Sequence, residues 1–284
     1  MDIRTIKITA DNVDKVLQSL IDDVDNIEAA EATLGLDIRG MVKLLSELPH
    51  NDDLYHNGET VLQHMRWVLA DLDGLSTGKD EATKQLLALA AMMHDLGKAY
   101  THGVLPEGKH TFYLHAEKSV QIAEVLLAKH RDQLGDMHGH LLDLVRLHDM
   151  FLHLANDRKQ QAPGATAYLK RFLQEALYTD GRIETLVALA KADSARSKAE
   201  AGVLGRIQGV LEDIAQVESA RAKVNDVKEQ RKANWYARQD EIRALLEREF
   251  PAAVAALPDQ SKVYAMLDKA KRIELIQTLR GIIA

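Results

Sequence analysis

The stretch LLALAAMMHDLGKAYTH, residues 86–102, decides the expected fold. Its apolar residues run around every face of a helix, which is typical of a helix buried in a protein core. His94 and Asp95 come at the end of this run, where a buried charge is costly unless it has a partner. A metal ion is such a partner, and an imidazole and a carboxylate can converge on one ion where a helix ends and the backbone turns. Gly97 permits that turn.

Two other apolar stretches each carry one polar residue of the same kind. TVLQHMRWVLADL contains His64, and TLVALAKADSAR contains Asp193. Taken singly, each is more simply explained as a core side chain that is hydrogen-bonded to a neighbour. Their joint occurrence with His94 and Asp95 predicts a metal site built from four residues.

The remaining apolar residues recur mostly at helical spacing, as in VDKVLQSLID, and only 5 prolines interrupt the 284 residues. This pattern predicts an all-α protein that is long enough to bury a substantial core. Short alternations in RTIKIT and HTFYLH permit brief extended segments but no real sheet.

Charge and composition exclude several classes of protein. The chain has 36 basic and 43 acidic residues and a net charge of -7, which repels a polyphosphate backbone, so any contact with nucleic acid is expected to be local. The absence of cysteine excludes disulfides, thiolate metal sites and cysteine nucleophiles, and it agrees with a cytoplasmic location. The first residues show no targeting pattern and no apolar run is long enough to span a bilayer, so no membrane partner is expected.

Histidine and charge divide the chain into three expected regions. Residues 1–50 predict amphipathic N-terminal helices, and residues 51–198, which hold eleven of the 12 histidines, predict the metal-binding domain. At the boundary between these two regions PHNDDLYHNG, residues 49–58, predicts a turn-rich connection. Residues 199–284 show a broken a/d-like spacing. They predict a C-terminal helical region that packs on its own domain or joins two copies of the chain as a homo-oligomer.

The order of His64, His94-Asp95 and Asp193 resembles the HD phosphohydrolase superfamily, whose fold is a helical bundle around a divalent metal. HNGETVLQHM, LAAMMHDLGKAYTH, FYLHAEKSVQIAEVLLAKH and LVRLHD are similar to the HD domain fused to some bacterial tRNA nucleotidyltransferases. The resemblance covers residues 55–196, about half of the chain. Those transferases also need a domain with a GG-containing turn and paired carboxylates, which the residues before Tyr55 lack. We therefore expect a free-standing HD protein that adds no nucleotides to tRNA.

A second doublet, His148-Asp149, leaves two assignments of the site. A rival set of His115, His148, Asp149 and Asp193 also satisfies the bare order, but the flanking LGK and the upstream histidine resemble the family context of the first doublet. Some members of the superfamily bind a second metal through extra histidines. This resemblance implies His115 and His148 as its ligands, with Asp95 shared by both ions. In the alternative, His115 hydrogen-bonds substrate or solvent and His148 orients a ligand of a single ion.

Two imidazoles and two carboxylates leave positions on an octahedral ion open for water and a phosphoryl oxygen. Such an ion activates water for hydrolysis without a serine or cysteine, and Asp95 can also orient that water. A mixed nitrogen and oxygen ligand set suits Mn, Co, Ni, Fe or Mg. One or two ions per chain are expected.

Two basic residues are candidates for binding phosphate. Lys98 follows His94 by four positions, so it shares the same face if the helix persists and would then act in catalysis and in substrate binding. The alternative is a solvated lysine near a helix end. Arg196 follows Asp193 by three positions, where it either clamps phosphate or is a surface arginine. The following histidines are interpreted as loop or surface residues: His56, His102, His110, His130, His138, His140 and His153.

The leading hypothesis is a metal-dependent phosphohydrolase, either a monoesterase or a diesterase, acting on nucleotides, cyclic nucleotides or RNA-end phosphates. Net negative charge favours a small phosphorylated substrate over a long strand. A non-enzymatic alternative is a nucleotide-sensing or scaffold HD module whose C-terminal helices bind a partner. A further alternative is a di-iron oxygenase, because a minority of HD-fold proteins carry two irons. Metal analysis and a substrate panel distinguish the three.

Overall fold

The computed structural model divides the chain into two compact units, Met1–Leu211 and Glu212–Ala284. The residues that it describes are 2–51, 53, 55–149, 151, 182–205, 207–209, 211–212, 223, 225–230, 247–248, 251–252, 273 and 277. His153 and most of the expected C-terminal helical region lie outside these residues.

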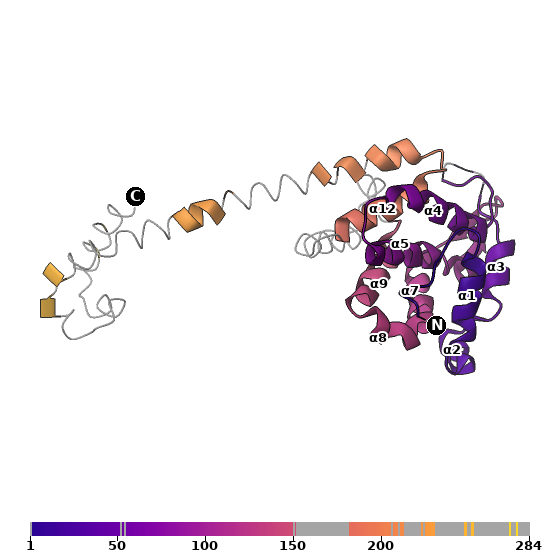
Figure 1. Cartoon of the computed structure of the whole chain (residues 1–284). Helices are drawn as coiled ribbons and strands as arrows, with labels where there is room; N and C mark the ends of the chain where they lie inside the picture. The colour runs from indigo at the N-terminus through magenta and orange to yellow at the C-terminus, as the bar shows by residue number, and fades with distance from the viewer. Residues whose placement is uncertain are drawn as a thin grey trace. The chain divides into compact units, whose positions relative to one another are not determined.

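The described part of the first unit is helical, as the apolar spacing predicts (Figure 1). The α-helices are α1 Val13–Asp22, α2 Ile27–Leu34, α3 Met41–Glu47, α4 Val61–Leu75, α5 Glu81–Met93, α6 Lys98–Thr101, α7 His115–Leu127, α8 Arg131–Leu134, α9 Asp136–Leu147 and α12 Arg182–Ser194. A short 3-10 helix, Ala128–His130, connects α7 to α8. The fold class is therefore all-α.

Helix α5 is the central element of this bundle. It packs against α4, α7, α9 and α12, and its residues from Leu89 to Met93 are inaccessible to solvent. Its sequence explains this position, because apolar side chains on every face need neighbours on every side. The small side chains of Ala90 and Ala91 let those neighbours approach closely. The end of α5, where His94 and Asp95 lie, is consequently buried in the middle of the unit.

The N-terminal helices belong to the same hydrophobic core. Helix α1 buries one apolar face, and it contacts α3 and α7. The spacing that predicted this helix is confirmed, since Val16, Leu17, Leu20 and Ile21 are all buried. Tyr100 in α6 donates a hydrogen bond from its hydroxyl to the backbone oxygen of Asp37 at 2.7 Å. The segment that precedes the domain therefore packs directly against it.

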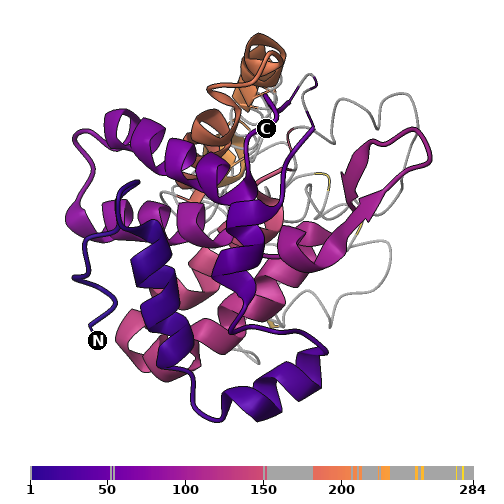
Figure 2. The same ribbon diagram turned by 90° about the vertical axis from the view of Figure 1, so that its right-hand side faces the viewer.

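The described residues contain one small sheet, which is a two-stranded hairpin. Strands β1 (His102–Val104) and β2 (His110–Phe112) pair antiparallel, with His102 opposite Phe112. Figure 2 shows the hairpin extending away from the helices. The alternation in HTFYLH is thus confirmed as an extended piece, whereas RTIKIT forms no strand. After β2, Leu114 adopts a left-handed φ of 60° and α7 begins.

None of the helices in the described part of the chain is long and apolar enough to cross a membrane.

Candidate metal centre

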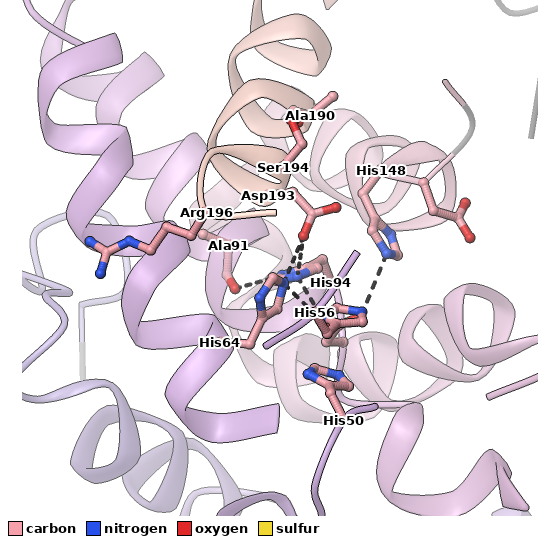
Figure 3. A network of polar contacts seen from close by, with 12 residues as sticks. His50, His56, His64, Ala91, His94, His148, Ala190, Asp193, Ser194 and Arg196 are labelled. Atoms are coloured by element: carbon pink, nitrogen blue, oxygen red, sulfur yellow. Dashed lines mark hydrogen bonds and ion pairs between the residues drawn. The ribbon is translucent and has the colours of Figure 1, made fainter. Parts of the chain in front are cut away.

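The polar residues singled out in the sequence meet where several helices begin or end. His94 is the C-terminal cap of α5, His148 is the C-terminal cap of α9, and His115 is the first residue of α7. Asp193 lies in the last turn of α12, and His64 lies in the first turns of α4, whose start is capped by a threonine hydroxyl. Figure 3 shows the side chains of His64, His94, His148 and Asp193 pointing toward one another from separate helices. The bundle therefore gathers ligands from distant segments into one buried place.

The first cluster consists of His64, His94, Asp95 and Asp193. His64 Nε2 lies 2.7 Å from Asp193 Oδ1, and His94 Nε2 lies 3.5 Å from the same oxygen. Asp95 Oδ2 lies 3.3 Å from His94 Nε2 and 3.7 Å from His64 Nε2. The four residues that the sequence joined as a ligand set are thus adjacent in space.

The second cluster lies on the other oxygen of the same aspartate. Asp95 Oδ1 is 3.4 Å from His115 Nε2 and 3.6 Å from His148 Nε2, and Asp149 Oδ2 is 4.0 Å from His115 Nε2. The rival doublet is therefore part of the same centre as the preferred one. Asp149 was assigned only to the rival set, and it joins the histidines implied for a second metal.

Three histidines direct the same ring nitrogen at the centre. The Nδ1 atoms of His94 and His148 lie 2.8 Å from the backbone oxygens of Ala91 and Val145, and Nδ1 of His115 lies 3.0 Å from a backbone oxygen. A carbonyl oxygen only accepts, so each Nδ1 carries the hydrogen and each Nε2 keeps its lone pair when the ring is neutral. Metal-binding histidines are commonly oriented in this way.

Several buried atoms of the centre lack a partner that a cation would supply. In the described residues, His94 Nε2 and both carboxylate oxygens of Asp95 are buried without a hydrogen bond, and the Asp95 Oδ2 has an ion pair with Lys98 Nζ at 2.8 Å. The Nε2 atoms of His115 and His148 face each other at 3.1 Å, which brings two lone pairs together if both rings are neutral. Buried polar atoms are normally satisfied. The donor set and its unpartnered atoms therefore fit one or two divalent ions.

The centre is strongly perturbed electrostatically. Burial by itself raises the pKa of Asp95 and Asp193, but the nearby histidines, and for Asp95 also Lys98, outweigh it and hold both pKa values well below the usual range. Burial lowers the pKa of His94, yet the two carboxylates overcome this and raise it to about 10. Both aspartates therefore stay ionised as ligands must, and a metal ion competes with a proton on His94.

Lys98 reaches the centre by a different path from the one its spacing implied. The α5 helix ends at Met93 and Lys98 begins α6, so the condition of a persisting helix, on which the shared face depended, is not met. The side chain is nevertheless 7% exposed, and its Nζ lies 2.8 Å from Asp95 Oδ2. The alternative of a solvated lysine is contradicted by this burial. Phe112 covers the ammonium, with its ring centre 5.5 Å from Nζ.

Gly97 is needed for close packing more than for its backbone freedom. Its φ of -63° is open to any residue. A Cβ atom at this position would lie 2.1 Å from the backbone oxygen of His115 and 2.7 Å from the backbone nitrogen of Ser119. The Gly97 nitrogen also donates to Ser119 Oγ at 2.8 Å. The glycine thus lets the turn after His94 lie directly against α7.

Arg196 is not brought to the centre. Its guanidinium makes two contacts of 2.9 Å with the carboxylate of Asp71 and lies over the ring of Trp67. Figure 3 shows the side chain extending away from the histidine cluster. Of its two expected roles, the placement matches the surface arginine.

Three residues before α4 form a polar cluster that the sequence reasoning missed. Glu59 Oε1 lies 3.2 Å from His50 Nδ1 and 3.0 Å from His56 Nδ1, and it lies 3.6 Å from Nδ1 of His64. His50 and Glu59 are almost fully buried. The backbone pairing of Pro49 with Thr60 closes this loop on itself. The only sequence signal was the density of histidines close before the predicted ligand helix.

The other histidines divide between surface and core. His130 and His138 are buried, so their interpretation as loop or surface residues is wrong. His102 and His110 lie in the hairpin with their rings stacked. His140 Nε2 lies 2.9 Å from the hydroxyl of Thr185. None of these residues lies in the two clusters around Asp95.

The family model of the HD domain matches residues 61–194. This part of the chain, which carries all four residues of the first cluster, therefore matches an HD domain, and the match supports a place in the superfamily of metal-dependent phosphohydrolases. Members of this family are generally metal-dependent phosphohydrolases, which supports a hydrolase role, and the histidine and aspartate clusters are compatible with divalent metal binding. No curated protein and no solved structure matches the chain.

Proposed function

We propose that this protein is a divalent-metal-dependent phosphohydrolase with two adjacent metal positions that share Asp95. The observation that supports it best is the buried Asp95 carboxylate, whose two oxygens face different imidazole clusters: Oδ1 accepts no hydrogen bond within the described residues, and Oδ2 is paired only with the Lys98 ammonium. His64, His94 and Asp193 would hold one ion, and His115, His148 and Asp149 the other. When bound, the ions polarise a phosphoryl group and lower the pKa of coordinated water.

The residues of the chain have distinct tasks in this reaction. Asp95 holds both clusters at one place and offers an ionised carboxylate that can orient the attacking water. Lys98 places a positive charge beside Asp95, where it can neutralise a non-bridging phosphate oxygen as negative charge develops. Mn, Co, Ni, Fe and Mg all suit the nitrogen and oxygen donors.

The proposed substrates are small phosphorylated molecules, namely nucleotides, cyclic nucleotides or RNA-end phosphates. Two features support this class: a single buried lysine at the centre and a net charge of -7, which disfavours long polyanions. The sequence similarity to HD domains of tRNA enzymes supports the RNA-end phosphate within that class.

Metal analysis followed by a substrate panel tests this proposal. The protein as purified is analysed for bound metals, then assayed with Mn, Co, Ni, Fe and Mg on phosphomonoesters, phosphodiesters and 2′,3′-cyclic nucleotides. We expect hydrolysis that a chelator abolishes and an added ion restores. Absorption bands of a mixed-valent iron pair would instead indicate the oxygenase alternative. Binding of nucleotide without turnover of any ester would indicate the sensing or scaffold module.

A further inference from the structure

The buried carboxylate of Glu59 fixes the tautomer of His50. Glu59 accepts hydrogen bonds from His50 and His56 and from the backbone nitrogen of Asn57 at 2.7 Å. Burial raises the pKa of Glu59, but these hydrogen bonds outweigh it and hold the pKa far below the usual range. An ionised carboxylate only accepts, so the hydrogen of a neutral His50 ring must lie on Nδ1. The lone pair of His50 is then on Nε2.

That lone pair accepts a hydrogen bond from the ammonium group of Lys98. Lys98 Nζ lies 3.0 Å from His50 Nε2, and both side chains are buried. Burial and the adjacent Lys98 charge lower the pKa of His50 to about 2, so the ring stays neutral and remains an acceptor. The contacts run without interruption from Glu59 through His50 and Lys98 to Asp95.

An ammonium group has three N–H donors. On Lys98, one faces Asp95 Oδ2 in an ion pair of 2.8 Å and one faces His50 Nε2 at 3.0 Å, which leaves one without a partner among the described residues. We propose that His50 is a positioning residue that orients the remaining N–H of Lys98 toward the phosphoryl group of the substrate. This inference rests on the proposed hydrolase function. Without His50, the flexible lysine keeps Asp95 as its only acceptor among these residues, and its charge moves toward the carboxylate.

The rings of His50 and His56 favour this hydrogen-bonding role over a third metal position. They stack with centres 3.8 Å apart and planes inclined by 16°. A nitrogen lone pair lies in the plane of its ring, so two parallel rings cannot both aim their Nδ1 lone pairs at one ion between them. The shared acceptor Glu59 satisfies both nitrogens without such an ion.

Two variants of His50 separate positioning from packing. His50→Phe keeps a ring of similar size but has no acceptor, whereas His50→Gln places an amide oxygen near the position of Nε2. We expect His50→Phe to lower kcat/KM by roughly 10- to 100-fold, the range for a slightly misplaced catalytic group, at full metal content. His50→Gln should recover most of this loss. Equal damage by both variants at full metal content would overturn the proposal.

A double-variant cycle with Lys98→Met tests whether His50 acts through Lys98. If it does, adding His50→Phe to Lys98→Met causes no further loss of kcat/KM, because the lysine to be oriented is already gone. Inorganic phosphate is the second probe. Calorimetry of the Mn-loaded protein should show weaker phosphate binding in His50→Phe, and no such weakening in the Lys98→Met background. The same factor in both backgrounds would contradict the proposal.

The unfolding midpoint of the metal-free protein tests the role of His50 without any measurement of activity. It therefore keeps this test separate from the test of the proposed function. His50→Phe should lower the unfolding midpoint in the wild-type background, where it removes an acceptor from a buried ammonium, and lower it less in Lys98→Met. If the wild type hydrolyses no phosphate ester, the proposed function fails. The double-variant cycles of phosphate binding and of the unfolding midpoint still show whether His50 acts through Lys98. Additive losses in both cycles would overturn its role.

Discussion

The Oδ1 of Asp95 lies 3.4 Å from Nε2 of His115. The other oxygen of the same carboxylate lies 3.3 Å from Nε2 of His94. One buried side chain therefore touches both clusters of the centre. The first cluster adds His64 from α4, the adjacent His94 at the end of α5 and Asp193 from α12, and the second adds His115 from the start of α7 and His148 with Asp149 from the end of α9. Removal of Asp95 is consequently expected to affect both metal positions together, whereas removal of a histidine affects only one.

Asp95→Ala should lose metal at both positions and lower kcat by at least about 10²- to 10³-fold, because the shared carboxylate and the orientation of water disappear together. The helical fold should persist, since the core helices pack through apolar side chains. Metal content by mass spectrometry, turnover and far-UV circular dichroism check these three outcomes. Full turnover of this variant in chelator would contradict the proposed function.

His115→Ala should retain one ion of the two. The cluster of His64, His94 and Asp193 does not include His115, so its affinity should change little. His64→Ala is the matched variant and should lose the other ion. Metal stoichiometry of the two variants and the wild type gives the answer. An identical stoichiometry in His115→Ala and wild type would favour a single ion with His115 as a substrate contact.

Lys98→Gln should lower kcat/KM by about 10²-fold, because it removes a positive charge beside the developing phosphate charge. Arg196→Gln is the control. Its guanidinium pairs with Asp71 outside the centre, and such an exposed pair contributes at most ~1 kcal/mol to stability. We expect its kcat/KM to stay within about two-fold of the wild type. A large loss of kcat/KM in Arg196→Gln would restore this arginine as a phosphate clamp.

Gly97→Ala should destabilise the protein by about 1 to 3 kcal/mol, because the new methyl group must displace the backbone of α7. Gly139→Ala in α9 is the control, since a Cβ atom there meets nothing within 4 Å. This change should stabilise the helix by up to ~1 kcal/mol. Urea unfolding measures both free energies. Equal stability of Gly97→Ala and wild type would show that the turn can move away from α7.

Acid should destabilise the metal-free protein partly through His50. Its pKa is lowered from 6.5 to about 2 in the folded state, so between these values the unfolded chain binds a proton that the folded protein does not. Stability therefore falls as the pH drops through this window, by up to ~1.4 kcal/mol per unit from this group. His115, with a pKa lowered to about 4, acts in the same direction.

His50→Gln isolates the contribution of that group. The variant cannot take up the proton, so its free energy of unfolding should fall less steeply than that of the wild type between about pH 6 and pH 5. Histidines common to both proteins, including His94 with its raised pKa, cancel in the difference. Parallel curves for the two proteins would show that His50 is protonated in the folded state.

Local pattern predicted the helices, and together with the resemblance to the HD family it predicted the set of four residues that the structure brings together in the first cluster. Apolar side chains on all faces of α5 predicted its burial, and burial made the polar pair after it informative. The exact partners of Lys98 could not be predicted, because the break after Met93 redirects its side chain. The spacing of residues along one helix does not predict the contacts of a side chain, such as that of Lys98, that follows a turn after the helix.

His50 and Glu59 escaped prediction for a related reason. They lie in a turn-rich segment, where no periodicity indicates which side chains are buried. Their position depends on long-range contacts, such as the paired hydrogen bonds of 2.8 Å between the Asn51 side chain and the backbone of His110. Asp149 was visible in the sequence, but nothing local showed that both doublets would meet at Asp95.

The match to the HD family begins at Val61, whereas His50, His56 and Glu59 precede it and touch Lys98 or His64. The segment that matches the family and the set of side chains that reach the centre therefore have different boundaries. A shortened chain that starts at Val61 would keep the residues proposed as ligands and lose the acceptor of the Lys98 ammonium. Transplanting this centre into another helical scaffold would accordingly require the preceding loop as well.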